Sequence, residues 1–276
     1  MRSRSRRLGQ HFLTDRNILS KIVDALDPTP DDVVLEIGAG KGALTRVLAP
    51  RVRVVRAIET DRRLAHDCGL TIADCGLHNV DVVPGDALKL DWHAFVGSHL
   101  PTPQSTIRNP QFKVVGNIPY AITSPLIDKA LTPPLPERIV FLVQAEVADR
   151  LAAPPGSKTY GAFSVGVQAV CRVERLFTVR AGAFTPPPRV ASAVVRLAPL
   201  VPPLVTDAEL LPLRRLVSAC FSRRRKQLRN VLLGVTGQSA ATVGEGLSAL
   251  QLDPAARPET LAPATYVRLL RWASRL

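Results

Sequence analysis

The sequence predicts an α/β fold with a mostly parallel sheet, followed by a small helical domain. Apolar β-type runs alternate with stretches long enough for helices or loops, which is typical of a parallel sheet covered on both faces. After Pro199 the pattern changes, because Pro202 and Pro203 indicate a linker and no β-type run follows. We therefore expect one domain over residues 1–200 and a second over residues 201–276.

The elements follow from hydrophobic spacing. The first predicted helix covers residues 17–27, where four apolar side chains share one helical face: Ile18, Ile22, Val23 and Leu26. Thr14 or Asp15 is expected to cap this helix. The predicted strands are residues 33–37, 52–58, 80–83, 112–115, 139–143 and 193–197. The stretches that form helices or connecting loops between them include 43–48 and 126–131. The helices predicted in the second domain are 207–220, 222–233 and 263–273.

Charge and composition limit the kind of partner. The 276-residue chain has a formal net charge of +13, which favours a polyanion, either nucleic acid or an anionic membrane surface, over a merely basic protein. No apolar run reaches the ~18 residues that a membrane span needs. The four cysteines match no zinc or redox motif, so we expect reduced thiols in a cytoplasmic protein. The N-terminal arginines form a basic arm rather than a transit peptide: Arg2, Arg4, Arg6 and Arg7.

The segment LEIGAGKGAL, residues 35–44, predicts a strand, a glycine-rich turn and the start of a helix. Gly38 and Gly40 permit a tight turn and the close approach of a ligand to the backbone. The spacing G-x-G-x-G matches neither the dinucleotide fingerprint G-x-G-x-x-G nor the phosphate-binding P-loop G-x-x-x-x-G-K-[ST]. Alone, this loop is weak evidence, since glycine also serves ordinary turns.

Two acids and an amide follow successive predicted strands. Glu59 ends the second strand at a spacing where an acid meets ribose hydroxyls, and Asp86 follows the third, where an acid accepts a hydrogen bond from an adenine amino group. Each acid alone is as well explained as a solvated carboxylate or a cap. Together with Asn117, they are expected to line the crevice at the carboxyl edge of the sheet, where open α/β proteins bind ligands.

This combination resembles class I S-adenosylmethionine-dependent methyltransferases, which have a Rossmann-like sheet. The segment Asn117-Ile118-Pro119-Tyr120 resembles the motif of methyltransferases that act on amino groups of nucleic-acid bases. The resemblance implies that the Asn117 amide oxygen and the Ile118 carbonyl accept the N–H bonds of the amino group. Pro119 makes the turn rigid, and Tyr120 stacks on the base. Such chemistry requires no histidine or lysine as a general base.

Longer segments resemble the rRNA adenine N6,N6-dimethyltransferases through nearly the whole chain. They are LGQHFLTD (8–15), EIGAGKGALT (36–45), GNIPYAITSP (116–125), PGSKTYGAFSV (155–165), AFTPPPRVASAVVRL (183–197) and FSRRRKQLRN (221–230). The fourth and sixth favour the branch that dimethylates two adjacent adenines in the 3′-terminal hairpin of small-subunit rRNA. The alternative branch comprises macrolide-resistance enzymes that modify large-subunit rRNA. At position 145 this chain has alanine where the first branch usually has lysine, so an RNA contact that the resemblance would imply there is missing.

The resemblance also assigns binding residues. It implies that S-adenosylmethionine contacts His11, Leu13, Gly38, Gly40, Glu59, Asp86 and Asn117, with histidine at position 11 where the family often has asparagine. Phe184 is a candidate second ring near the target base, and a core role before the rigid proline turn is equally compatible. No metal is implied.

A basic run marks the second domain. Arg223, Arg224, Arg225, Lys226 and Arg229 are predicted to lie in one helix and to contact phosphates of the small-subunit rRNA in a pre-ribosomal particle. We expect a monomer with no membrane partner. Two further readings remain: a non-catalytic ribosome-assembly or transcription factor of the same fold, and an NAD-dependent oxidoreductase, which the glycine spacing disfavours.

Overall fold

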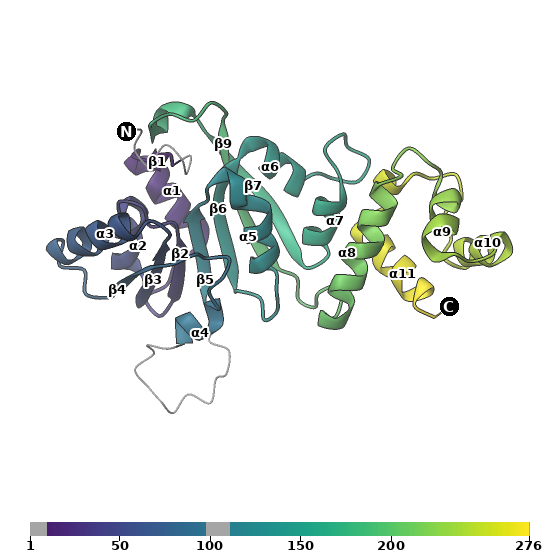
Figure 1. Cartoon of the computed structure of the whole chain (residues 1–276), viewed down its shortest axis with the longest axis horizontal. Coiled ribbons are helices and arrows are strands. Elements are labelled where there is room, and N and C mark those ends of the chain that lie inside the picture. The colour runs from purple at the N-terminus through teal and green to yellow at the C-terminus, as the bar shows by residue number, and fades with distance from the viewer. Residues whose placement is uncertain (1–9, 98–110, 276) are drawn as a thin grey trace. The chain divides into compact units, whose positions relative to one another are not determined.

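The computed structural model describes residues 10–97 and 111–275, and the chain folds as two compact units (Figure 1). The first unit contains the described residues up to Ala148 together with Glu174–Ala198. The second contains Asp149–Val173 and the described part of Pro199–Leu276. The basic arm expected at Arg2, Arg4, Arg6 and Arg7 lies outside the described residues.

A seven-stranded sheet has the order β4-β3-β2-β5-β6-β9-β7. Its first five strands in that order run parallel: β4 (Val80–Pro84), β3 (Val54–Glu59), β2 (Val33–Ile37), β5 (Lys113–Asn117) and β6 (Arg138–Gln144). Strand β9 (Ser192–Pro199) pairs with β6 in the antiparallel direction, and β7 (Cys171–Val179) lies beside β9. A separate pair joins β1 (Phe12–Leu13) to β8 (Phe184–Thr185). The predicted mostly parallel α/β sheet is confirmed, although β7 was not predicted.

Both faces of the sheet are covered. All five residues of β2 are buried, and successive strand residues point to opposite faces, so neither face meets solvent there. The helices of this unit are α1 (Arg16–Leu26), α2 (Ala43–Leu48), α3 (Arg62–Asp74), α4 (Trp92–Gly97), α5 (Thr123–Ala130) and α6 (Ala145–Leu151), which extends across the unit boundary. The carboxylate of Asp15 caps α1 by accepting the N–H bonds of Asn17 and Ile18, as one of the two predicted caps.

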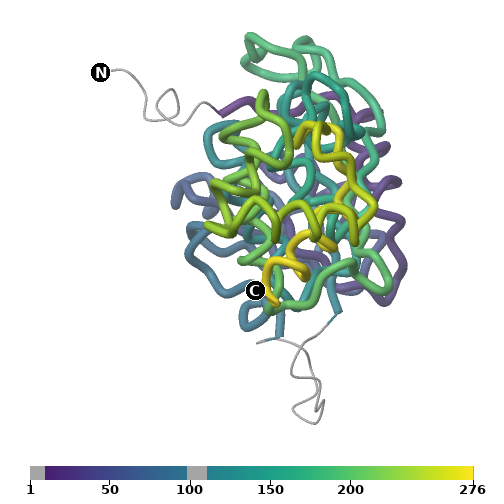
Figure 2. Tube along the Cα trace, turned by 90° about the vertical axis from the view of Figure 1, so that its right-hand side faces the viewer, coloured from purple at the N-terminus to yellow at the C-terminus, as the bar shows by residue number. Residues whose placement is uncertain are grey.

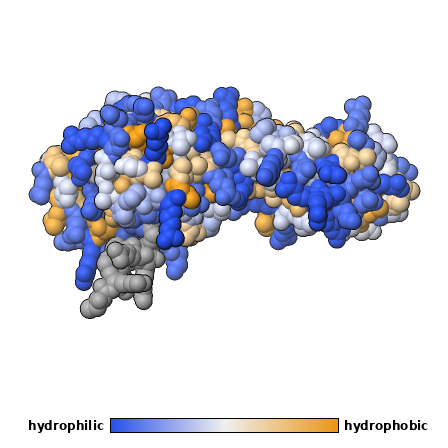
Figure 3. Space-filling model, turned by 90° about the horizontal axis from the view of Figure 1, so that it is seen from above, coloured by the Kyte–Doolittle hydropathy of each residue, from blue (hydrophilic) through white to orange (hydrophobic). Residues whose placement is uncertain are grey.

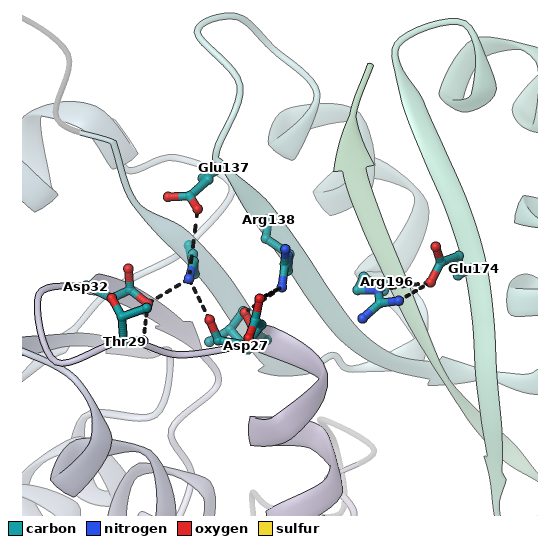
Figure 4. Close-up of polar contacts among 9 residues, drawn as sticks. Asp27, Thr29, Asp32, Glu137, Arg138, Glu174 and Arg196 are labelled. Atoms are coloured by element: carbon teal, nitrogen blue, oxygen red, sulfur yellow. Dashed lines mark hydrogen bonds and ion pairs between the residues drawn. The ribbon is translucent and has the colours of Figure 1, made fainter. Parts of the chain in front are cut away.

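Polar contacts join Asp27, Thr29, Asp32, Glu137 and Arg138 at the amino edge of the sheet (Figure 4), and a buried lysine organises them. Lys113, 3% exposed, begins β5 and donates to the Asp32 carboxylate and to the Asp27 carbonyl, both at 2.7 Å. Burial raises the pKa of Asp32, but hydrogen bonds from Lys113 and Thr29 outweigh it and hold the pKa below its usual value. The pair thus anchors the strand whose other end carries Asn117.

The second unit is helical. Besides residues of α6, it contains α7 (Ala162–Gln168), α8 (Asp207–Phe221), α9 (Leu228–Thr236), α10 (Ala240–Ala249) and α11 (Pro263–Ala273), the last four coloured green to yellow in Figure 2. Its core holds three aromatic rings, with Phe221 6.0 Å from Tyr160 and 6.1 Å from Tyr266 between ring centroids. The two tyrosine hydroxyls are satisfied by the carbonyls of Leu261 and Pro258.

Two sequence expectations need correction here. Residues Asp149–Val173 belong with the C-terminal helices rather than with residues 1–200, because α7 packs against α8 and α11. The predicted helix over 222–233 is also wrong at its start: α8 ends at Phe221, residues 222–227 form a turn, and α9 begins at Leu228. At the start of α9, Leu228 donates its N–H to the carbonyl of Ala256 rather than to a residue of the preceding turn.

Candidate active site

The carboxyl edge of the parallel sheet brings together residues from four strand ends. Gly38 follows β2, Glu59 ends β3, Asp86 follows β4 and Asn117 ends β5. All four line one cavity of about 320 Å³, together with His11, Gly40 and the segment Ile118 to Tyr120. The residues predicted for cofactor and base thus share one cavity, except for Leu13 and Phe184.

The glycine loop is shaped by what lies against it. Gly38 and Gly40 have φ values of +80° and +56°, in the left-handed region that L side chains rarely adopt. A Cβ on Gly40 would stand 3.2 Å from the Phe12 ring, and one on Gly38 would stand 3.3 Å from the Asn117 carbonyl oxygen. Glycine is therefore required both for the turn and for the close approach of its neighbours.

Glu59 connects the glycine loop to its own strand end. One carboxylate oxygen accepts the Gly40 N–H at 2.9 Å, and the other accepts the Asp61 N–H at 2.9 Å. Each oxygen of an ionised carboxylate accepts more than one hydrogen bond. Glu59 is 5% exposed and lines the cavity, so its remaining acceptor positions suit the paired hydroxyls of a ribose.

Asp86 lies in the turn after β4. One of its carboxylate oxygens accepts the Leu88 N–H at 3.0 Å, which fixes the side chain within the turn. The residue is half-buried and lines the same cavity. Its carboxylate is chemically suited to accept from an adenine amino group.

Asn117 is oriented by the N-terminal segment. Its amide nitrogen donates to the carbonyl of His11 at 2.9 Å. A carbonyl accepts but cannot donate, so the amide nitrogen faces His11, and the amide oxygen is left as an acceptor on the other branch of the side chain. The arrangement presents the group that base recognition requires.

The rings of Tyr120 and His11 line the same cavity as Asn117. Tyr120 opens the 3₁₀ turn Tyr120–Ile122 directly after Pro119, and its hydroxyl lies 2.7 Å from the Ser192 hydroxyl. The His11 ring centroid is 6.0 Å from that of Tyr120. Nδ1 of His11 lies 2.8 Å from the Pro186 carbonyl and therefore carries the proton of that hydrogen bond. Sequence reasoning did not single out Ser192, although it lies within the segment 183–197 that resembles the family.

A second cavity, of about 530 Å³, includes residues of the glycine loop and Asn117. Leu13 lines this cavity instead of the first, and so does Glu36 of β2, which the sequence reasoning missed. Glu36 is 1% exposed, and its Oε2 has no hydrogen-bond partner among the described residues. Burial and then the nearby Glu59 raise the pKa of Glu36 to about 7, against the opposing effect of Thr45. The sequence signal that could have identified Glu36 is its position as the one acidic residue within the apolar strand Val33–Ile37.

Phe184 is not brought to the cavity. It is 4% exposed, pairs with Leu13 in the short β1–β8 sheet and packs in the hydrophobic core. Of the two roles that the sequence left open for Phe184, this burial supports the core role.

The five basic residues predicted to contact rRNA are exposed, and Figure 3 shows hydrophilic residues gathered on one face of the second unit. Arg223, Arg224, Arg225 and Lys226 occupy the turn between α8 and α9, while Arg229 lies in α9. Arg224 is paired with Glu259, with nitrogen and oxygen 2.6 Å apart. We refer to residues 223–226 as the basic turn. No helix among the described residues is long and apolar enough to cross a membrane.

The residues that line the cavity fit S-adenosylmethionine. Two carboxylates at neighbouring strand ends provide acceptors for ribose hydroxyls and an adenine amino group, and the left-handed glycines leave space that a Cβ would fill. Asn117, Pro119 and Tyr120 stand in the same wall, where a second, reacting group would meet the cofactor.

Known proteins are similar to this chain over nearly its full length. The family model for ribosomal RNA adenine dimethylase matches residues 1–273. A relative from Nitrosococcus oceani, ribosomal RNA small subunit methyltransferase A, is 41% identical over 97% of this chain and 95% of its own length. The protein of the same name from Geobacillus kaustophilus is 42% identical over 95% and 88%, respectively.

Solved structures agree with these sequence relationships. A dimethyladenosine transferase from Plasmodium falciparum superposes with a TM-score of 0.77 at 28% identity, covering 94% of this chain and 96% of that one. The 23S rRNA methyltransferase ErmE gives 0.74 at 29% identity, covering 95% and 99%. The predicted class I methyltransferase fold and S-adenosylmethionine as its cofactor are thereby confirmed. Since the family model spans the chain and relatives exceed 40% identity, the chain belongs to the ribosomal RNA adenine dimethylase family.

Proposed function

We propose that this chain dimethylates N6 of two adjacent adenines in the 3′-terminal hairpin of small-subunit rRNA, using S-adenosylmethionine. The observation that carries the proposal is the position of the Asn117 amide. It lines the cavity that also contains the acceptors Glu59 and Asp86. A cofactor held by the two acids would therefore lie within reach of a base held at Asn117.

The chemistry requires acceptors more than a base. The lone pair of an adenine amino group is delocalised into the ring, so the amino group is a poor nucleophile. Two acceptors, the Asn117 side-chain oxygen and the Ile118 carbonyl, would hold its N–H bonds and turn the lone pair out of the ring plane. Asn117 already has its amide nitrogen occupied by the His11 carbonyl, which presets the orientation.

Tyr120 supports the base from its face. A base stacked on an aromatic side chain gains roughly 1–3 kcal/mol, which offsets part of the cost of unstacking the adenine from its hairpin. The Tyr120 ring is half-buried in the wall that carries Asn117. Base and amide acceptor therefore meet on one short segment of chain, Asn117–Tyr120.

The proton balance needs no dedicated side chain. When bound, S-adenosylmethionine supplies an electrophilic methyl group on a sulfonium. The methylated amino nitrogen carries a positive charge and is strongly acidic, so its proton leaves to water or to a neighbouring carbonyl. The second methyl transfer repeats the same step on the monomethylated nitrogen, which keeps one N–H for an acceptor.

A second candidate is methylation of large-subunit rRNA. The ErmE similarity favours it, since its TM-score of 0.74 is close to the 0.77 of the dimethyladenosine transferase. The curated relatives favour the small subunit, because two of them, at 41% and 42% identity, carry the name ribosomal RNA small subunit methyltransferase A. A purely structural assembly role is disfavoured by the complete Asn117–Tyr120 segment.

We further propose a monomer that acts on pre-ribosomal particles in the cytoplasm, with the second unit as the rRNA-recognition part. The net charge of +13 and the exposed basic turn support a polyanionic partner. Phosphate contacts there would position the particle, while the cavity at Asn117 would select the base.

Transfer of tritiated methyl groups to purified immature small subunits tests the function, with large subunits in parallel. We expect incorporation into small-subunit rRNA, at two adjacent adenines when reverse-transcriptase stops are mapped. Incorporation into the large subunit would support the second candidate. No incorporation into either, with S-adenosylmethionine bound normally, would support the non-catalytic role.

A further inference from the structure

We propose that Ser192 is a positioning residue for base methylation, because its hydroxyl holds the far end of the Tyr120 side chain and so fixes where the ring lies. This inference deepens the proposed function and rests on it for the role of the base. The hydroxyl oxygens of Ser192 and Tyr120 are 2.7 Å apart, a short hydrogen bond between residues 72 positions apart in sequence.

The two ends of the Tyr120 side chain are held by different parts of the first unit. Its Cα lies in the turn after Pro119, which ends the segment carrying Asn117. Its hydroxyl meets Ser192 at the start of β9. The hydroxyl oxygen of a tyrosine lies on the axis of the Cβ–Cγ bond, so a contact there restricts rotation about the Cα–Cβ bond and fixes where the ring lies. The ring is thereby held as a preset platform for a base.

Ser192 is itself rigidly placed. The residue is fully buried and pairs in register with Gln144 of β6, the strand next to β5. The hydroxyl of a buried serine needs a partner, and the Tyr120 hydroxyl supplies one at the cavity wall. The antiparallel strand β9, which carries none of the predicted cofactor contacts, thus acts on the active site through one hydrogen bond.

A purely structural reading is that the pair only satisfies two hydroxyls. The two readings differ in what changes when the bond is lost. Ser192→Ala should lower stability under either reading. If Ser192 positions the ring, it should also lower the methyl-transfer rate, with cofactor affinity unchanged, because Tyr120 would contact the base and Ser192 lies outside the cavity lining.

The kinetic test is a double-mutant cycle with Ser192→Ala, Tyr120→Phe and the double variant. Single-turnover methylation of immature small subunits should fall roughly three- to tenfold for Ser192→Ala. Because Tyr120→Phe removes the same bond but keeps the ring, Ser192→Ala should have little further effect in that background. Ser192→Thr, which keeps the hydroxyl, should recover most of the rate. Full additivity would overturn the proposal.

A matched control uses Ser164 of α7, which is equally buried and donates to the Arg150 carbonyl. Ser164→Ala removes a buried serine hydroxyl from the second unit, and Ser164 is not among the residues that line the cavity. It should reduce the melting temperature without changing the single-turnover rate. An equal loss of rate in both variants would show that the Ser192 effect is general destabilisation.

A spectroscopic measurement separates this inference from the proposed function. The chain has three tyrosines, so ring-labelled tyrosine gives a small set of NMR signals, of which Tyr160 and Tyr266 belong to the buried core of the second unit. Ser192→Ala should shift and mobilise the Tyr120 ring signals and leave the other two unchanged. Unchanged Tyr120 signals would overturn the inference even if the wild type methylates rRNA. Absent methylation by the wild type would defeat the proposed function alone.

Discussion

The carboxylate of Glu59 holds the backbone N–H of Gly40 at 2.9 Å. The end of β3 is thus hydrogen-bonded to the glycine loop that follows β2. The acid expected to hold the ribose and the loop expected to lie beneath the cofactor therefore depend on each other. Disturbing either residue changes both the acceptors for ribose and the shape of the loop beneath the cofactor.

Glu59→Ala should therefore weaken S-adenosylmethionine binding strongly, on the order of 10- to 100-fold, since it loses hydrogen bonds to a charged acceptor. Titration calorimetry measures this affinity. Binding to immature small subunits should stay nearly intact, because the residue faces the cofactor cavity. Glu59→Gln keeps one acceptor oxygen and should fall between wild type and alanine. Cofactor affinity unchanged in both variants would contradict the assignment.

Asn117→Ala should reduce the single-turnover methyl-transfer rate by about 10²–10³-fold, the usual effect of removing one preorganised polar group at a reacting centre. The amide would matter chiefly in the transition state, so cofactor affinity should change less. Asn117→Asp is the matched variant, because it keeps an acceptor oxygen but loses the donor to the His11 carbonyl. A near-normal rate for Asn117→Ala would leave the residue with a structural role.

Glu36 should make stability depend on pH. Its pKa is raised from 4.5 to about 7, so the folded protein retains a proton that the unfolded chain loses. The contribution of this proton to the free energy of unfolding is fully present below pH 4.5 and is lost as the pH rises through about 7. Glu36→Gln removes this dependence, and its stability relative to wild type should rise by about 3 kcal/mol between pH 4 and pH 8.

Urea unfolding of wild type and Glu36→Gln at several pH values gives this difference directly. Asp24→Asn is a suitable control, since Asp24 is exposed and pairs with Arg51 on the surface. A parallel pH course for wild type and Glu36→Gln would mean that Glu36 ionises near its ordinary pKa in the folded protein.

All four residues of the basic turn are exposed, but Arg224 also forms an ion pair with Glu259. Replacing Arg223, Arg225 and Lys226 by alanine should weaken binding to immature small subunits. If each contacts one phosphate, the log–log salt slope should fall by roughly two to three units. Arg224→Ala is the comparison variant, since its charge is already paired with Glu259 and its loss should change the slope less. Filter binding across salt concentrations measures both. Equal salt slopes for wild type and the triple variant would show that the basic turn is only a solvated surface and contacts no phosphate.

Local sequence patterns were enough to predict the elements around the cofactor cavity. The strand ends at Glu59 and Asn117 and the turn at Asp86 follow from apolar runs bounded by polar residues, and parallel strands bring such ends to one edge. The Asp15 cap and the glycine turn are equally local, since a cap and a left-handed φ depend on a few neighbouring residues.

The tertiary structure alone decided which distant residues meet. The bond between Tyr120 and Ser192, the burial of Phe184 and the grouping of Asp149–Val173 with the C-terminal helices all depend on packing between segments far apart in sequence. Helix α10, with two glycines and weak patterning, and the turn at residues 222–227 were missed for the same reason. Local propensity is a weak determinant compared with the burial of an apolar face, and that burial is defined only once the partners are in place.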